Sequence, residues 1–163
     1  MRLILVRHAE AEDAVTSDEA RRLTPRGHQQ AANLRDALRR ASVTPEVVAT
    51  SPLVRTTQTA EVLAALLSDG SGVVAIDLMR PGELRPKKLS KQFAEFGVKT
   101  VILVGHMPDL STYAAWLLGV TEYAVPFDKG AAMGLSVRRG EFEEGCAVLE
   151  WFVTPAWCEA TSP

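Results

Sequence analysis

Leu3-Ile4-Leu5-Val6-Arg7-His8 begins as an unbroken apolar run and ends abruptly in two chargeable side chains. A short apolar run without alternation is typical of a strand that is buried on both faces of a parallel sheet. In open α/β sheets, ligands bind outside the carboxyl ends of the strands. If residues 2–6 form a central strand, Arg7 and His8 therefore lie where chemistry is expected.

Segments typical of strands and helices alternate along most of the chain. Short apolar runs predict further strands at residues 47–50, 73–76 and 100–104. Helical spacing and turn residues predict helices between and after these strands, at residues 25–44, 52–68, 88–96 and 109–118. Such alternation indicates a largely parallel sheet with helices on both faces.

The C-terminal third has a different pattern. Two expected strands, residues 131–138 and 147–153, have no helix between them and are joined by a polar turn, which predicts an antiparallel hairpin. Residues 154–163 are expected to be a loose tail anchored by Trp157. The predicted fold class is therefore α/β, a three-layer α/β/α sandwich with a mostly parallel central sheet of about six strands and a C-terminal antiparallel element.

Two helix starts carry capping signals. Thr24 precedes Pro25, and Ser51 precedes Pro52. A serine or threonine side chain can accept a hydrogen bond from the first helical turn, and proline fits the first helical position. We therefore expect Thr24 and Ser51 to be N-caps.

Length, composition and charge exclude several classes of protein. A chain of 163 residues with 47% hydrophobic and 23% charged residues is ordinary for a globular protein, so we expect one domain over residues 1–163. A net charge of -2 provides no basic field for nucleic acid, and no apolar stretch reaches membrane-spanning length. Cys146 and Cys158 form neither a disulfide framework nor a zinc pattern. The expectation is a cytoplasmic monomer without a metal, a cofactor or a membrane partner.

Chargeable side chains follow three of the predicted strands. Arg7 and His8 follow the first, Arg55 lies just after the second, and His106 follows the fourth. Their convergence would be costly to bury without an anion, and the arginine fork binds phosphate well. A neutral imidazole among such cations is a candidate nucleophile toward phosphorus. Positive neighbours should lower the pKa of His8, so we expect activity to fall in acid.

Each of these residues, taken singly, also fits an ordinary structural role. A histidine at a strand end is usually a hydrogen-bonded structural residue, and Arg55 alone would be an ion-pair partner. Arg21, in the charged loop over residues 9–22, and Glu83 would each be solvated loop residues. It is the arrangement of the side chains at several strand ends that favours a functional site.

The segments around these side chains resemble, in order, the motifs of the histidine phosphatase superfamily, its phosphoglycerate mutase-like branch. The matching segments are Leu5-Val6-Arg7-His8-Ala9-Glu10, Leu23-Thr24-x-x-Gly27, Ser51-Pro52-Leu53-x-Arg55-Thr56-x-Gln58-Thr59-Ala60 and Val104-Gly105-His106-Met107-Pro108. The resemblance covers residue 2 to about residue 112, and several motifs in the right order make a strong signal.

The resemblance implies specific roles. His8 would be the nucleophile that is transiently phosphorylated, while Arg7 and Arg55 would hold the phosphoryl oxygens. His106 would complete the pocket and stabilise the charge that develops during transfer. Arg21 would contribute to substrate binding, and Glu83 is the candidate general acid by position. Phosphate or another oxyanion would occupy the pocket, with no metal.

The short span between Thr59 and Gly105 predicts a shallow, open pocket. Openness suits a phosphorylated side chain on another protein better than a small metabolite that must be enclosed. With Arg21 ahead of Leu23-Thr24, the chain is similar to compact SixA-type phosphohistidine phosphatases, which implies a histidine phosphotransfer domain of a signalling relay as partner.

Two departures from the family pattern bear on the substrate. Ala9 stands where glycine usually follows the histidine, and the sequence around Glu83 matches the family's acid segment poorly. A protonated phosphoramidate leaves more easily than an alkoxide, so the lack of a clear acid favours phosphohistidine. The alternatives are a phosphomonoesterase for a small phosphate ester or phospho-Ser/Thr, a phospho-ligand binding module, and a structural domain without a site.

Overall fold

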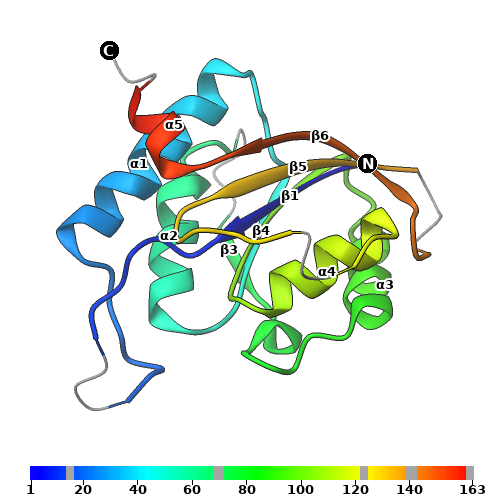
Figure 1. Ribbon diagram of the computed structural model, residues 1–163, viewed down its shortest axis with the longest axis horizontal. Coiled ribbons are helices and arrows are strands. Elements are labelled where there is room, and N and C mark those ends of the chain that lie inside the picture. Colours follow the sequence, from blue (N-terminus) through cyan, green and yellow to red (C-terminus); the bar gives the residue numbers. More distant parts are fainter. Residues whose placement is uncertain (14–16, 68–71, 122–124, 139–142, 161–163) are drawn as a thin grey trace.

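The computed structural model describes residues 1–13, 17–67, 72–121, 125–138 and 143–160, which form one six-stranded sheet with helices on both faces (Figure 1). The strands are β1 (Arg2–Arg7), β2 (Val47–Thr50), β3 (Val73–Ala75), β4 (Thr100–Gly105), β5 (Ala132–Val137) and β6 (Ala147–Val153). The helices are α1 (Pro25–Arg40), α2 (Val54–Ala64), the short 3-10 helix η1 (Asp77–Met79), α3 (Pro86–Phe96), α4 (Asp109–Leu118) and α5 (Pro155–Ala160).

The sheet has the strand order β3-β2-β4-β1-β5-β6. The first four strands in the sequence are mutually parallel, with β4 between β2 and β1. β5 pairs antiparallel with β1, and β6 pairs antiparallel with β5. The α/β fold class, the mostly parallel sheet and the antiparallel C-terminal hairpin are therefore confirmed.

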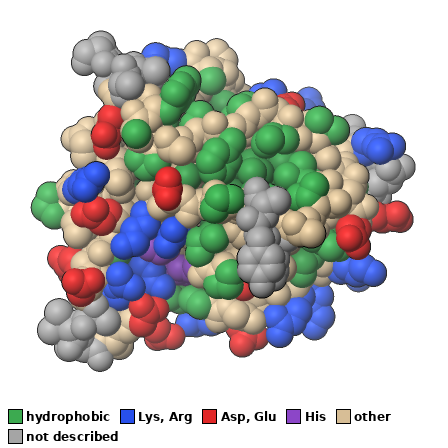
Figure 2. Space-filling view, viewed as in Figure 1, with side chains coloured by type: hydrophobic (Ala, Val, Ile, Leu, Met, Phe, Trp, Pro, Cys, Tyr) green, Lys and Arg blue, Asp and Glu red, His purple; other side chains and the backbone are tan. Residues whose placement is uncertain are grey.

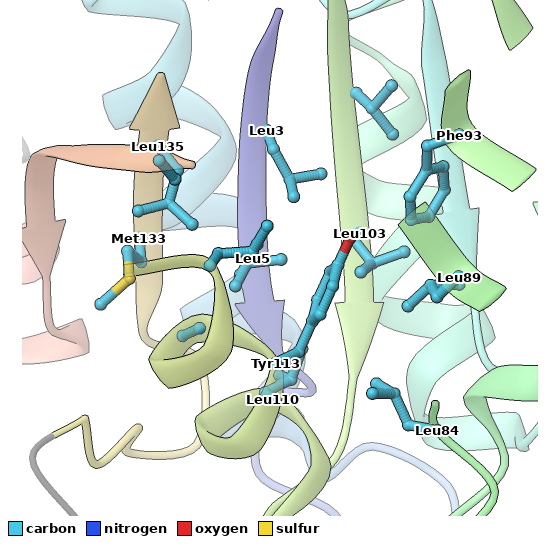
Figure 3. Packing of buried hydrophobic residues seen from close by; sticks show 14 of the residues in the cluster. Leu3, Leu5, Leu84, Leu89, Phe93, Leu103, Leu110, Tyr113, Met133 and Leu135 are labelled. Carbon is cyan, nitrogen blue, oxygen red and sulfur yellow. The ribbon is translucent and has the colours of Figure 1, made fainter. Parts of the chain in front are cut away.

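Both faces of β1 are covered, which explains why its sequence does not alternate. Leu3 and Leu5 are fully buried in the cluster formed with α3 and α4, where they point toward Tyr113 and Leu103 (Figure 3). Ile4 and Val6 belong to a second cluster on the opposite face, formed with α1 and α2. A strand covered on both faces requires apolar residues at consecutive positions.

The predicted cap of α1 is confirmed, whereas the predicted cap of α2 is wrong. The Thr24 side chain accepts a hydrogen bond from Gly27 N at 3.0 Å, with Pro25 at the helix start. α2 begins only at Val54, after Leu53, which has no side-chain cap. The Ser51 hydroxyl instead lies 2.9 Å from a ring nitrogen of His106, so a contact between distant segments replaces the local one.

The tail prediction is also corrected, because residues 155–160 form a helix rather than a loose segment. Pro155 starts α5, and Cys158 N donates to Thr154 O at 3.1 Å. The helix is anchored by Cys158, which is 1% exposed beside the α1 face, while Trp157 is 53% exposed. The remaining tail, residues 161–163, and the turn at Gly140 lie outside the described residues.

Among the residues that the structure describes, no helix combines the length and the apolar character that crossing a membrane requires.

Gly27 provides a test of the packing between α1 and the segment after β1. A Cβ at Gly27 would lie 1.9 Å from the backbone oxygen of Glu10, whereas a Cβ at Gly72 would meet nothing within 4 Å. We expect Gly27→Ala to lower the free energy of unfolding by about 1–3 kcal/mol, because backbone atoms must move apart. Urea unfolding measures this change, and Gly72→Ala should stay within about 0.5 kcal/mol of wild type. Equal effects of the two substitutions would contradict the predicted contact.

Candidate active site

Strand pairing brings the ends of β1, β2 and β4 together. Arg7 at the end of β1 pairs with Gly105 at the end of β4, and His8 N donates to Gly105 O at 3.0 Å. On the other side of β4, Ser51 N donates to Val104 O at 3.1 Å. The residues that follow the three strands therefore meet at one edge of the sheet, as the sequence predicted.

His8 and His106 lie side by side below the surface. Their ring centroids are 5.3 Å apart with an interplanar angle of 58°, and the two residues are 6% and 3% exposed. Figure 2 shows histidine side chains among Lys and Arg side chains on this face of the molecule, next to a broad apolar area. Arg55, Arg7 and Lys129 act on His8 electrostatically, so the pair occupies a positively charged setting.

A backbone carbonyl determines the tautomer of His8. Its Nδ1 lies 2.8 Å from the oxygen of Ala9. A carbonyl oxygen can only accept, so Nδ1 carries the proton. In the neutral ring, Nε2 therefore keeps its lone pair, which is the state that a nucleophile needs.

Burial keeps His8 neutral. Desolvation is the largest cause that lowers its pKa from 6.5 to about 4, the Ala9 hydrogen bond opposes the shift, and Arg55, Arg7 and Lys129 lower the pKa further. The positive neighbours, from which the sequence predicted the shift, are therefore a smaller cause than desolvation. A pKa of about 4 moves the acid limb of any His8-dependent reaction below the physiological range.

In His106 the hydrogen bond is made by the other ring nitrogen, Nε2. Its Nε2 lies 2.9 Å from Ser51 Oγ, and its Nδ1 is buried without a hydrogen-bond partner. Desolvation first, and then Arg55, His8 and Arg7, lower the pKa of His106 to about 3, with Asp18 opposing. If the Ser51 hydroxyl donates to Nε2, the neutral ring carries its proton on Nδ1 and presents a donor.

Arg7 and Arg55 are each fixed by hydrogen bonds from Nη atoms of their guanidinium groups. Arg7 Nη1 donates to the carbonyl oxygen of Phe127 at 2.7 Å. Arg55 donates from Nη1 to the backbone oxygen of Asp18 at 2.6 Å and from Nη2 to its carboxylate at 2.9 Å. The Nε atoms of both arginines are buried and have no partner.

Three buried side-chain nitrogens of the described residues lack a partner: Arg7 Nε, Arg55 Nε and His106 Nδ1. All three belong to side chains that the sequence placed at strand ends. A buried donor without a partner costs about 1–3 kcal/mol, so three of them at one edge of a sheet favour a site that binds an oxyanion. The two guanidinium groups supply the positive charge.

The two remaining predicted residues lie in different places. Arg21 is connected to the cluster, because its Nη1 donates to the Asp18 carboxylate at 3.0 Å and its Nε donates to Glu12 O. Glu83 is exposed in the turn between η1 and α3. No hydrogen bond or ion pair among the described residues joins its side chain to the two histidines or to the two arginines. The structure therefore brings Arg21, but not Glu83, into contact with the cluster.

Three contributions were missed by the sequence analysis, namely those of Asp18, the Ser51 hydroxyl and the Phe127 carbonyl. The spacing of Asp18 and Arg21 in a charged loop is the one signal that was available for Asp18.

Tyr113 is fully buried in the core and pairs with Ser90 at 2.8 Å. No group of His, Cys, Asp or Glu in the described ranges is arranged to hold a metal ion.

Comparisons with known proteins agree with the motifs. Residues 3–79 match the histidine phosphatase superfamily (branch 1). No curated protein matches the chain. This match confirms, over residues 3–79, the resemblance that the motifs indicated, and similar solved structures share the fold.

Three of these structures cover nearly the whole chain. The protein histidine phosphatase SixA complexed with tungstate is 24% identical, with 96% of this chain and 98% of that chain covered and a TM-score of 0.84. A candidate phosphohistidine phosphatase SixA from Agrobacterium tumefaciens is 26% identical, with coverages of 94% and 97% and a TM-score of 0.77. A phosphoserine phosphatase mutant from Entamoeba histolytica in complex with phosphoserine is 19% identical, with coverages of 94% and 97% and a TM-score of 0.71.

The lowered pKa of His8 predicts how stability depends on pH. Between about pH 4 and 6.5 the unfolded chain binds a proton at residue 8 that the folded protein excludes, so the free energy of unfolding falls as the pH falls. His8→Asn keeps a donor for the Ala9 carbonyl but cannot titrate. Between pH 7 and pH 5 we expect this variant to lose about 2 kcal/mol less than wild type in urea titrations.

His28, which is exposed on α1, provides the control. His28→Asn makes the same substitution outside the cluster and is measured in the same urea titrations. Parallel pH profiles for wild type and His8→Asn would show that residue 8 is not desolvated in the folded protein.

Proposed function

We infer from these matches that the chain belongs to the histidine phosphatase superfamily, and we propose that it removes phosphate from phosphohistidine on a signalling protein. The observation that carries the proposal is a group of three buried nitrogens without a partner in the described residues, Arg7 Nε, Arg55 Nε and His106 Nδ1, near a neutral His8. All three are donors when the Ser51 hydroxyl donates to His106 Nε2. A phosphoryl group brings oxygens for these donors and an electrophilic phosphorus for the free Nε2 of His8.

In the first step, the donors hold the phosphoryl oxygens while His8 Nε2 attacks phosphorus. The new P–N bond forms on His8 as the P–N bond of the substrate histidine breaks. The substrate ring leaves as a neutral imidazole when its other nitrogen is already protonated. Phosphoryl transfer of this kind requires positioning and charge stabilisation more than a dedicated acid.

In the second step, a water oxygen attacks phosphorus, the P–N bond to His8 breaks, and a proton of the water passes to the released phosphate. Phosphorylation at Nε2 gives the His8 ring a positive charge, since Nδ1 is also protonated. The Ala9 carbonyl, 2.8 Å from Nδ1, stabilises this cation. His8 then returns to the neutral tautomer in which the cycle began.

Phosphohistidine fits the site better than a phosphate ester because an alkoxide leaving group needs a proton. Glu83, the acid candidate from the sequence, makes no bond to the cluster in the described residues. An ester phosphatase is the second candidate, supported by the structural similarity to the phosphoserine phosphatase from Entamoeba histolytica. Ester hydrolysis is therefore the alternative outcome when a phosphohistidine substrate is compared with a phosphate ester.

The partner that we propose is a histidine phosphotransfer domain in the cytoplasm, on which the protein acts as a monomer. The described residues between Thr59 and Gly105 are taken up by the end of α2, β3, η1, α3 and β4. They include no added segment beyond these elements, which leaves access for a side chain on the surface of another protein.

The decisive experiment compares two substrates, a phosphorylated histidine phosphotransfer domain and p-nitrophenyl phosphate. Wild type should dephosphorylate the first substrate and hydrolyse the second slowly. His8→Ala should reduce the first rate at least about a thousandfold, because the attacking nitrogen is lost. His28→Ala, with an exposed histidine changed, should retain the wild-type rate.

Two other results would replace the proposal. Faster hydrolysis of the ester than of phosphohistidine would identify a phosphomonoesterase. Binding of inorganic phosphate without turnover of either substrate would identify a phospho-ligand binding module, and that binding would survive His8→Ala.

A further inference from the structure

Asp18 connects two of the arginines at the site. Its carboxylate accepts from Arg55 Nη2 at 2.9 Å through one oxygen and from Arg21 Nη1 at 3.0 Å through the other. Its backbone oxygen also accepts from Arg55 Nη1 at 2.6 Å. A single residue therefore engages both terminal nitrogens of Arg55.

This contact determines the direction of the third Arg55 nitrogen. The guanidinium group is planar, so a group held at both Nη atoms has little freedom to turn its Nε–H. The Nε atom is one of the three buried donors without a partner. Each Nη keeps a second N–H, but Nε is the one nitrogen of Arg55 without any partner among the described residues, so the contacts with Asp18 leave the Nε–H to meet an oxyanion.

Asp18 lies at the protein surface, whereas Arg55, which it holds, is buried. The side chain of Arg55 is 5% exposed, whereas that of Asp18 is 57% exposed. The loop that carries Asp18 is itself tied down, because Glu19 O accepts from Val54 N at 3.3 Å and Glu12 O accepts from Arg21 Nε. The orientation of a buried arginine is therefore controlled from a solvent-exposed loop.

We propose that Asp18 is a positioning residue that directs Arg55 Nε toward the phosphoryl group, an inference that rests on the proposed phosphatase function. The carboxylate also carries a negative charge next to the site. Its neutralisation should not weaken the attraction of the site for phosphate. Loss of Asp18 should therefore impair the turnover number while leaving phosphate affinity unchanged or increased.

The chain offers a matched control in Asp36. Its carboxylate also bridges two arginines, Arg35 at 2.9 Å and Arg39 at 3.0 Å, but it lies on α1. Neither of these arginines belongs to the cluster of unpartnered donors. Asp36→Asn therefore removes the same kind of ion pair without touching Arg55.

The first readout is turnover by Asp18→Asn and Asp36→Asn. For Asp18→Asn we expect kcat to fall about ten- to a hundredfold, the cost of a misplaced positioning group. Its Kd for inorganic phosphate, measured by calorimetry, should remain within about threefold of wild type or decrease. Asp36→Asn should change neither quantity. An Asp18→Asn variant with wild-type kcat, or with equal losses in kcat and phosphate affinity, would overturn the proposal.

The second readout does not depend on catalysis. The Arg55 Nε–H resonance, assigned by its absence in Arg55→Lys, should exchange with solvent at least about tenfold faster in Asp18→Asn than in wild type or Asp36→Asn. Unchanged exchange would show that Asp18 does not order Arg55. If wild type turns over neither substrate, the proposed function fails while this measurement still decides the role of Asp18.

Discussion

The parallel pairing of β1 with β4 is the constraint on which the site depends. Arg7 pairs with Gly105, and a histidine follows each of these residues in the sequence. The pairing therefore brings the two histidine rings to 5.3 Å from one another. A shift of either strand by one residue would turn its side chains to the opposite face of the sheet. A shift of β1 would move Arg2 or Arg7 into a position that the buried run Leu3 to Val6 now fills, so the polar ends of the run oppose it.

Burial at this strand edge lowers the pKa of the two histidines and of Arg7, but only the histidines become neutral. Desolvation holds the pKa of His8 at about 4, so the imidazole is neutral without any catalytic partner. The same burial lowers the pKa of Arg7, with Asp128 opposing, yet a guanidinium group remains charged. A neutral imidazole and cationic donors can therefore share one small volume, which is the combination that the proposed phosphoryl transfer requires.

The sequence predicted the features that depend on local patterns. The strand ends just before His8 and His106, the Thr24 cap and the C-terminal hairpin follow from short runs of residues. It did not predict the pairing of Ser51 with His106 or of Asp18 with Arg55, because these contacts join segments 55 and 37 residues apart. The helix at residues 155–160 was missed because a buried cysteine anchors it to α1 residues that are far away in the sequence.

The attachment of His8 to the frame of the sheet has an evolutionary consequence. Its backbone N–H is bonded to β4 and its carbonyl accepts from Gly130 N in the turn before β5, so main-chain hydrogen bonds hold the proposed nucleophile. Insertions in the surface loops can change what is recognised without breaking these bonds. A scaffold of this kind can diversify by loop replacement alone, so related chains can share one chemistry and differ in their targets.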